Sequence, residues 1–104
     1  MSAKEMIVTT GCLNRQTFSL PCLGSELDSL LILYGQLGKV RVRKTIDECV
    51  FRENLAQVDI SPEETLLFEP LEKGICQIQG KTRGGSPIVS LVIPFRCTEL
   101  MEDV

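Results

Sequence analysis

The chain has 104 residues, 43% of them hydrophobic, with 14 acidic side chains, 11 basic ones and no histidine. This size predicts a single domain whose core needs no metal or disulfide support. The net charge of −3 argues against general nucleic-acid binding, for which strongly basic domains are typical. Without histidine, Ser–His and Cys–His catalytic pairs and mixed Cys/His zinc sites are excluded. We therefore predict no catalytic residue, no cofactor and no metal ligand.

The first predicted elements are short strands. Gln16–Leu20 alternates apolar and polar residues, which puts Phe18 and Leu20 on one face. Asp28–Gly35 is an apolar run of strand length. Both patterns predict strands.

A basic hairpin strand follows. Gly38 interrupts the apolar pattern as a turn residue does, and Lys39–Lys44 then alternates valines with basic residues. Because β-branched residues in alternation favour strands, we expect Val40 and Val42 to face inward and both arginines of this strand to face outward. Two more strands are predicted beyond it, separated by the turn residues Arg52–Asn54. They are Cys49–Phe51 and Ala56–Ile60.

A short helical turn is predicted next. Ser61 suits an N-cap, Pro62 suits the first helical position, and Glu64 completes an S-x-x-E capping box. Pro70 ends the segment so soon that the helix must gain its stability from packing. We expect Leu66–Phe68 to supply that packing as the chain crosses from one sheet to another.

The last third of the chain predicts a long hairpin. Gly74–Thr82 alternates, Arg83–Ser86 has turn composition, and Pro87–Cys97 returns as one strand. Since proline cannot donate a ladder hydrogen bond, Pro94 predicts a free or bulged edge there. Residues 98–104 are predicted to form a flexible acidic tail. The aligned apolar positions of the returning strand are Val89, Leu91, Ile93, Phe95 and Cys97.

Short strands joined by turns, without strand–helix–strand alternation, predict an all-β fold. We expect one antiparallel, immunoglobulin-like β-sandwich over residues 1–104, with its short helical crossover near residues 61–68.

The five cysteines are widely spaced and include no CxxC pair, so a thiolate zinc site is not expected. A disulfide between Cys22 and Cys76 would suit a sandwich, but immunoglobulin domains with this bond pack it against a tryptophan, which this chain lacks. Free thiols in a reducing compartment are the favoured interpretation, with Cys76 and Cys97 in the core.

Candidate partner-binding residues gather in the basic strand. Lys39, Arg41, Arg43 and Lys44 put four positive charges within six positions. A solvated face or a charge-protected edge strand explains this pattern more simply than a contact surface does. Tyr34, at the end of an apolar strand, is either a core residue or an interface anchor.

The segment MSAKEMIVTT lacks the apolar core of a secretory signal, and LLILY is far too short to span a bilayer. We expect a soluble cytoplasmic protein without membrane contact.

Three stretches resemble a family of small phage and prophage proteins from Gram-positive bacteria, encoded in virion morphogenesis gene clusters. They are LILYGQLGKVRVRKT, VDISPEETLLFEP and ICQIQGKTRGGSPIVSLVIPF, which lie between about Leu30 and Cys97. The positions that match the family pattern are Gln36, Ser61–Phe68, Ile78–Gln79, Gly84–Gly85 and Ser90.

Members of this family resemble the immunoglobulin-like domain that opens some baseplate proteins. The resemblance implies a non-enzymatic structural or assembly role in a tail, neck or baseplate. Its partners would be other virion proteins and further copies of the chain, in the host cytoplasm or in the particle. The alternatives are a free-standing bacterial adaptor for a protein or small ligand, which predicts a well-formed apolar pocket and a stable monomer, and a weak nucleic-acid binder using the basic strand.

Overall fold

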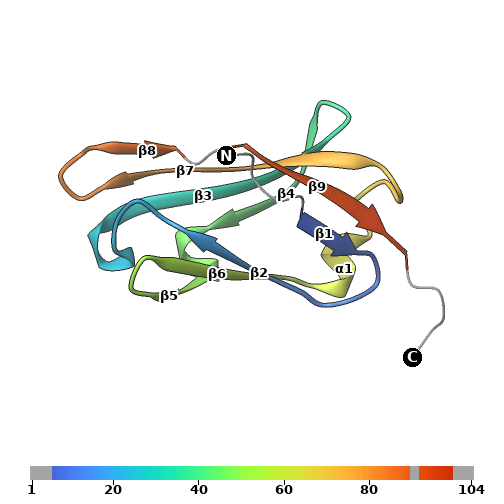
Figure 1. Cartoon of the computed structure of the whole chain (residues 1–104), viewed down its shortest axis with the longest axis horizontal. Helices are drawn as coiled ribbons and strands as arrows, with labels where there is room; N and C mark the ends of the chain where they lie inside the picture. Colours follow the sequence, from blue (N-terminus) through green and yellow to red (C-terminus); the bar gives the residue numbers. More distant parts are fainter. Residues whose placement is uncertain (1–5, 90–91, 100–104) are drawn as a thin grey trace.

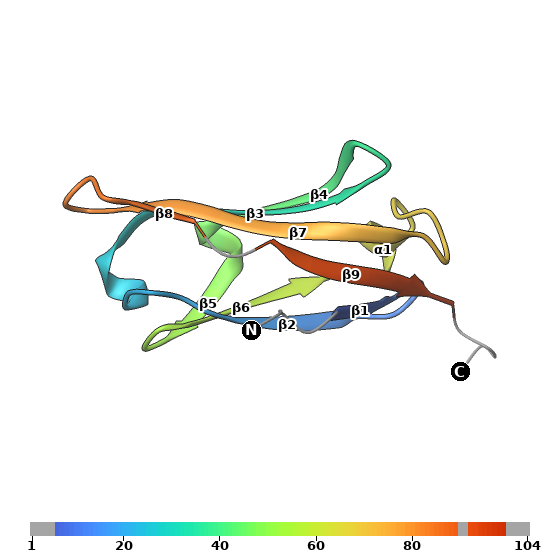
Figure 2. The ribbon, with the colours of Figure 1, turned by 45° about the horizontal axis from the view of Figure 1, so that its top comes forward.

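Two sheets face each other in the computed structural model of the chain, which describes residues 6–89 and 92–99. The larger sheet has the strand order β1 (Met6–Thr9), β9 (Ile93–Thr98), β7 (Lys73–Thr82), β3 (Leu27–Gln36) and β4 (Lys39–Thr45), with β8 (Pro87–Val89) also beside β7. The smaller sheet has the order β2 (Asn14–Ser19), β6 (Leu55–Ile60) and β5 (Cys49–Arg52). Figures 1 and 2 show the two layers with α1 (Pro62–Thr65) closing one end. Two short 3-10 turns, η1 (Gly24–Glu26) and η2 (Ile46–Glu48), precede β3 and β5.

The predicted all-β sandwich is therefore confirmed. β1 pairs with β9 in parallel, whereas the other described strand pairs are antiparallel. The hairpin turns at Gly38 and at Arg83–Ser86 lie where the sequence predicts them, and so does the β5–β6 turn.

The core lies between the sheets and consists of the inward side chains of alternating strand positions. Phe18 and Leu20 are buried as predicted. Tyr34, Phe68 and Phe95 meet edge to face, with ring centroids 5.3–6.2 Å apart. This aromatic cluster joins β3, β9 and the segment after α1, so the crossover is packed into the same core as the strands.

The predicted capping box at the start of α1 is confirmed. The amide of Glu64 donates to Ser61 Oγ at 3.1 Å, and the amide of Ser61 donates to Glu64 Oε1 at 2.9 Å. The expected packing of the residues after it is wrong for two of the three. Phe68 is buried, but Leu66 and Leu67 are 72% and 56% exposed, because the helix ends after one turn and only Phe68 reaches the core.

The expected orientation of the basic strand is also wrong in part. Tyr34 pairs with Val42 while its neighbour Gly35 pairs with Val40, so Arg41 is an extra residue in a β-bulge. The bulge moves Val40 to the outer face of the sheet, while Val42 and Lys44 face inward.

The returning strand of the last hairpin is divided rather than continuous. β8 pairs with residues 79–81 of β7, and β9 pairs with residues 73–76 after a shift of register by one residue. Phe95 and Cys97 are buried, whereas the predicted orientations of Val89 and Leu91 and the position of Ser90 lie outside what the structure describes. Among the described residues, pairing between β1 and β9 begins at Met6 and Phe95. The free edge expected beside Pro94 stays a prediction, because the residue that would face Pro94 from β1 lies outside the described residues.

The expected inclusion of Thr98 in a flexible tail is wrong, because Thr98 is the last residue of β9 and contacts Thr9 and Thr10. Residues 100–104 of that tail lie outside the described residues.

Candidate protein-contact surface

Charge is strongly segregated between the larger sheet and the rest of the chain. Within residues 6–89 and 92–99, seven basic residues lie on its strands, whereas Asp28 is the one acidic residue that does. These strands therefore carry a net charge of +6 in a chain whose total is −3. The seven basic residues are Lys39, Arg41, Arg43, Lys44, Lys73, Lys81 and Arg96.

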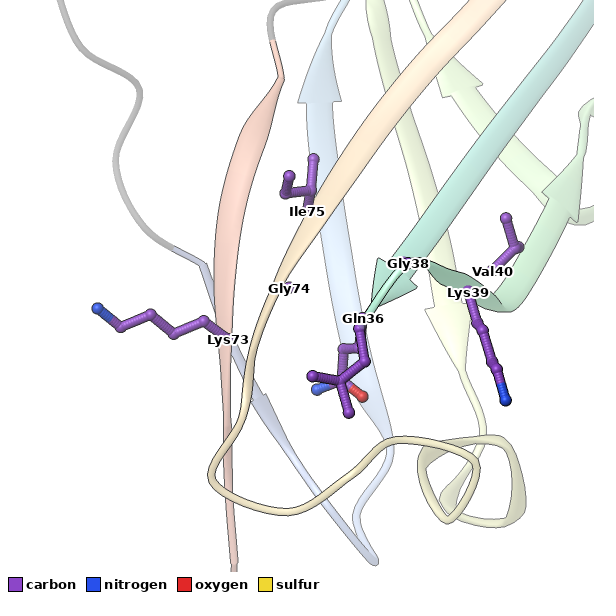
Figure 3. A pocket seen from close by; sticks show the side chains of 9 residues that line it. Gln36, Gly38, Lys39, Val40, Lys73, Gly74 and Ile75 are labelled. Atoms are coloured by element: carbon purple, nitrogen blue, oxygen red, sulfur yellow. The ribbon is translucent and has the colours of Figure 1, made fainter.

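An apolar row crosses the outer face of this sheet. Val40 pairs with Gly35, Gly35 with Ile75, and Ile75 with Pro94. Val40 and Ile75 are 55% and 54% exposed, while Gly35 has no side chain to fill the space between them. The result is a shallow depression of about 280 Å³, which we call the sheet hollow (Figure 3).

Basic side chains border the sheet hollow. Figure 3 shows Lys39 and Lys73 on opposite sides of it, and Arg43 lies on the same face, beside Leu33. Among the described residues these three cations have no ion-pair partner. Arg41 Nε is shielded from solvent and likewise lacks a hydrogen-bond acceptor within the described part of the chain. An apolar centre with a cationic border suits a partner that offers apolar side chains among carboxylates.

The β3–β4 turn adds a strained apolar residue to this border. Leu37 and Gly38 both have left-handed backbone conformations, with φ of 51° and 75°. A two-residue hairpin turn of this kind favours asparagine or glycine at the first position, yet a leucine that is 63% exposed occupies it. Such a conformation in a non-glycine residue is more often kept where it has a function.

The structure separates the five candidate residues predicted from the sequence. Lys39 and Arg43 are exposed and Arg41 is partly buried, all on the edge strand β4. Lys44 and Tyr34 are only 5% and 0% exposed, so neither side chain is available to a partner in this structure.

Lys44 and Tyr34 have structural roles instead. Lys44 Nζ lies 2.7 Å from both carboxylate oxygens of Glu64. Tyr34 belongs to the aromatic cluster, and burial raises its pKa. Its hydroxyl lies near the thiol of Cys76 on the neighbouring strand, but it makes no hydrogen bond of good geometry with a described residue.

A second exposed apolar surface lies at the end of the sandwich near α1. We call Ser61–Glu72 the leucine segment, because Leu66, Leu67 and Leu71 are 72%, 56% and 71% exposed. The segment has four carboxylates and no basic residue. Three of these carboxylates, those of Glu63, Glu69 and Glu72, are exposed.

The leucine segment is held firmly at three places. Glu64 pairs with Lys44, and Thr65 Oγ1 accepts a hydrogen bond from the amide of Gly11 at 2.8 Å. The buried side chain of Gln36 accepts from the amide of Glu69 at 2.8 Å and donates to the carbonyls of Glu69 and Glu72 at 3.2 Å. These contacts fix the backbone that carries the exposed leucines, so the apolar surface is pre-organised.

Sequence reasoning missed this second surface because leucines next to a capped helix resemble core residues. One signal was present: three leucines within six positions exceed what a one-turn helix can bury.

Burial governs the protonation of several thiols. Burial raises the pKa of Cys76 to about 12 and also raises the pKa of Cys97 and Cys49, which keeps these thiols protonated at neutral pH. Within residues 6–89 and 92–99, no three Cys, Asp or Glu side chains are grouped as metal ligands. In the same residues no helix has the length and apolar character needed to cross a membrane.

Comparisons of the chain with protein-family models, with curated proteins and with solved structures found no match.

Proposed function

We propose that this chain is a non-catalytic, immunoglobulin-like module that binds other proteins through the outer face of its larger sheet. We further propose that it serves as a structural or assembly component of a phage or prophage virion. The observation that carries the proposal is the exposed apolar row at the sheet hollow. Two lysines and an arginine without an ion-pair partner in the described part of the chain border it.

The strand order supports the immunoglobulin-like assignment. The smaller sheet, β2-β6-β5, corresponds to strands B, E and D of such sandwiches, and the order β9-β7-β3-β4 corresponds to G, F, C and C′. In this correspondence α1 occupies the crossover from E to F.

The phage assignment rests on the sequence resemblance, and two of its matching positions have defined contacts. Gln36 anchors the loop after α1, and Ser61 caps the helix. Both residues hold the backbone of residues 61–72 in place. Two positions of the resembling motifs therefore fix the conformation of this exposed segment.

A protein partner fits the sheet hollow better than a small ligand does. Small-molecule sites are typically concave cavities of about 300–1,000 Å³ that enclose most of the ligand. The sheet hollow has a volume of about 280 Å³ and lies on an open sheet face. Two larger hollows, of about 370 Å³ beside Val50 and about 500 Å³ beside Pro87, lie elsewhere on the described part of the chain. The open face favours a protein contact over an enclosed small ligand at the sheet hollow itself.

The experiment compares two matched double variants in the host that carries the gene. Val40→Asp with Arg43→Glu alters the outer face of β4, and Val50→Asp with Arg52→Glu makes the same changes on the exposed edge strand β5. After prophage induction, particles and assembly intermediates are purified and their proteins are identified by mass spectrometry. We expect the wild type and the β5 variant in these fractions, and at least a tenfold loss of the β4 variant.

Absence of the wild-type chain from all particle and intermediate fractions would contradict the virion role. Equal recovery of both variants would contradict the contact surface. Salt-sensitive binding of the purified chain to DNA, abolished by the β4 changes alone, would favour the nucleic-acid alternative instead.

A further inference from the structure

We propose that the partner of the sheet hollow is the leucine segment of a second copy of this chain, in a two-fold dimer. The inference deepens the proposed function and rests on its contact surface. It starts from two surfaces that are each exposed in one copy and complementary to one another.

Their charges are complementary. The border of the sheet hollow carries Lys39 and Lys73, whereas Glu69 and Glu72 are exposed on the leucine segment. None of these four side chains has an ion-pair partner among the described residues. Opposite potentials of this kind align two surfaces and disfavour contacts between like charges.

Their apolar groups are also complementary. The sheet hollow is a depression between Val40 and Ile75, and the leucine segment presents Leu66 and Leu67 on a backbone that Gln36 and Lys44 hold in place. A leucine side chain entering a depression that lacks a side chain at its centre would bury apolar area on both partners. The pre-organised backbone lowers the conformational cost of binding.

The positions of the two surfaces favour a closed dimer. The leucine segment ends at Glu72 and the border residue Lys73 follows directly. Figures 1 and 2 show α1 and the β3–β4 hairpin at the same end of the sandwich. Because the surfaces adjoin, one two-fold axis can bring each leucine segment onto the hollow of the other copy, making the same contact twice.

Charge exchange between the surfaces tests this arrangement. One variant, Lys39→Glu with Lys73→Glu, reverses the hollow border, and another, Glu69→Lys with Glu72→Lys, reverses the segment. Replacing the side chains of Glu69 and Glu72 should leave the fold intact, because Gln36 forms its hydrogen bonds with the backbone at these two positions. A matched control, Asp47→Lys with Glu53→Lys, changes exposed carboxylates outside both surfaces.

Sedimentation velocity over a concentration series gives the readout. We expect dimers for the wild type and the control that weaken as ionic strength rises, and at least a tenfold weaker dimer for each reversed variant. An equimolar mixture of the two reversed variants should form a 1:1 dimer, because both contacts then pair opposite charges. Circular dichroism confirms that each variant is folded before it is compared.

Three results would overturn the dimer: a monomeric wild type at every concentration, reversed variants that dimerise normally, or a mixture that stays monomeric although both variants are folded. A monomer that still enters virion particles contradicts the dimer and leaves the proposed function standing. A chain that dimerises but never enters particles contradicts the virion role and leaves the dimer standing.

Discussion

Lys44 Nζ lies 2.7 Å from each carboxylate oxygen of Glu64, and this ion pair joins the edge strand β4 to helix α1. The lysine side chain is only 7% exposed. Glu64 also accepts a hydrogen bond from the amide of Ser61, which closes the capping box. A single carboxylate thus couples the cap of the helix to the strand that borders the sheet hollow.

Replacing this carboxylate should be costly and should change the response to acid. In Glu64→Gln the buried ammonium loses its main partner, for which we expect a loss of about 2–4 kcal/mol in the free energy of unfolding at pH 7. The neighbouring change Glu63→Gln, at an exposed carboxylate without an ion pair among the described residues, should alter it by less than about 0.5 kcal/mol. Urea unfolding of both variants measures the difference.

The pH dependence follows from the pKa of Glu64. Burial alone would raise this pKa, but hydrogen bonds from Lys44 and Ser61 and the charge of Lys44 outweigh it, and the pKa is lowered from its ordinary 4.5. The stabilisation is therefore complete above about pH 4.5 and is lost as the pH falls through the lowered pKa. Wild type should lose more stability than Glu64→Gln over this acidic range, and parallel curves would contradict the role of the pair.

Removing the hydroxyl of Tyr34 should not weaken the fold. This oxygen is buried near the thiol of Cys76 and makes no hydrogen bond of good geometry with a described residue, while the ring packs against Phe68 and Phe95. In Tyr34→Phe the ring contacts remain, so we expect a free energy of unfolding that is unchanged or raised by up to about 1 kcal/mol. Thermal and urea unfolding test this, and a clear loss of stability would show that the hydroxyl makes a contact the structure lacks.

Substitutions at two glycines on adjacent strands should have opposite effects on the stability of the fold. A Cβ on Gly74 would lie 2.3 Å from the ring of Phe95 and 2.5 Å from the carbonyl oxygen of Gly35, so Gly74→Ala should destabilise the fold by about 1–3 kcal/mol or more. A Cβ on Gly35 comes no closer than 3.4 Å to its neighbours, and it points into the sheet hollow. Gly35→Val should therefore fold normally, since valine suits strands, while filling the hollow.

Association and stability must be measured together for this pair. We expect Gly35→Val to keep the stability of the wild type while the dissociation constant of the dimer rises at least tenfold. A normally associating Gly35→Val would show that no side chain enters the hollow.

Because the turn at Leu37 is strained, replacing this residue should raise the stability of the fold and weaken association of the chain. Asparagine adopts the left-handed conformation more readily than leucine does and is favoured in this turn type, so Leu37→Asn should stabilise the fold by about 0.5–1 kcal/mol. It also removes an exposed apolar side chain from the border of the hollow, so association should weaken. A variant that is more stable and associates as tightly as the wild type would assign Leu37 no part in binding.

Local patterns in the sequence determine much of this fold. Alternation places Phe18 and Phe95 in the core, and the spacing of Ser61 and Glu64 identifies the helix cap, because these features depend on neighbours in the chain. The bulge at Arg41 is different, since it depends on the register between β3 and β4. It moves Val40 from the inner face, where alternation predicts it, to the outer face, whereas Val42 stays on the inner face as expected.

The candidate surfaces depend on tertiary contacts that no local pattern contains. Gln36 is buried because its amide satisfies backbone groups of Glu69 and Glu72, more than 30 positions away. Leu66 is exposed because Phe68 and the polar contacts of Glu64 and Glu69 already hold the segment in place. Hydrophobicity alone cannot distinguish such a leucine from a core residue.

Amide-resolved nuclear magnetic resonance on dilution of the uniformly labelled wild-type chain tests the central claim most directly. We predict that the amides of Lys39, Val40 and Ile75 shift together with those of Leu66, Leu67 and Leu71 as the dimer dissociates. Dilution shifts confined to the outer face of the smaller sheet, or spectra that do not change with concentration, would contradict it.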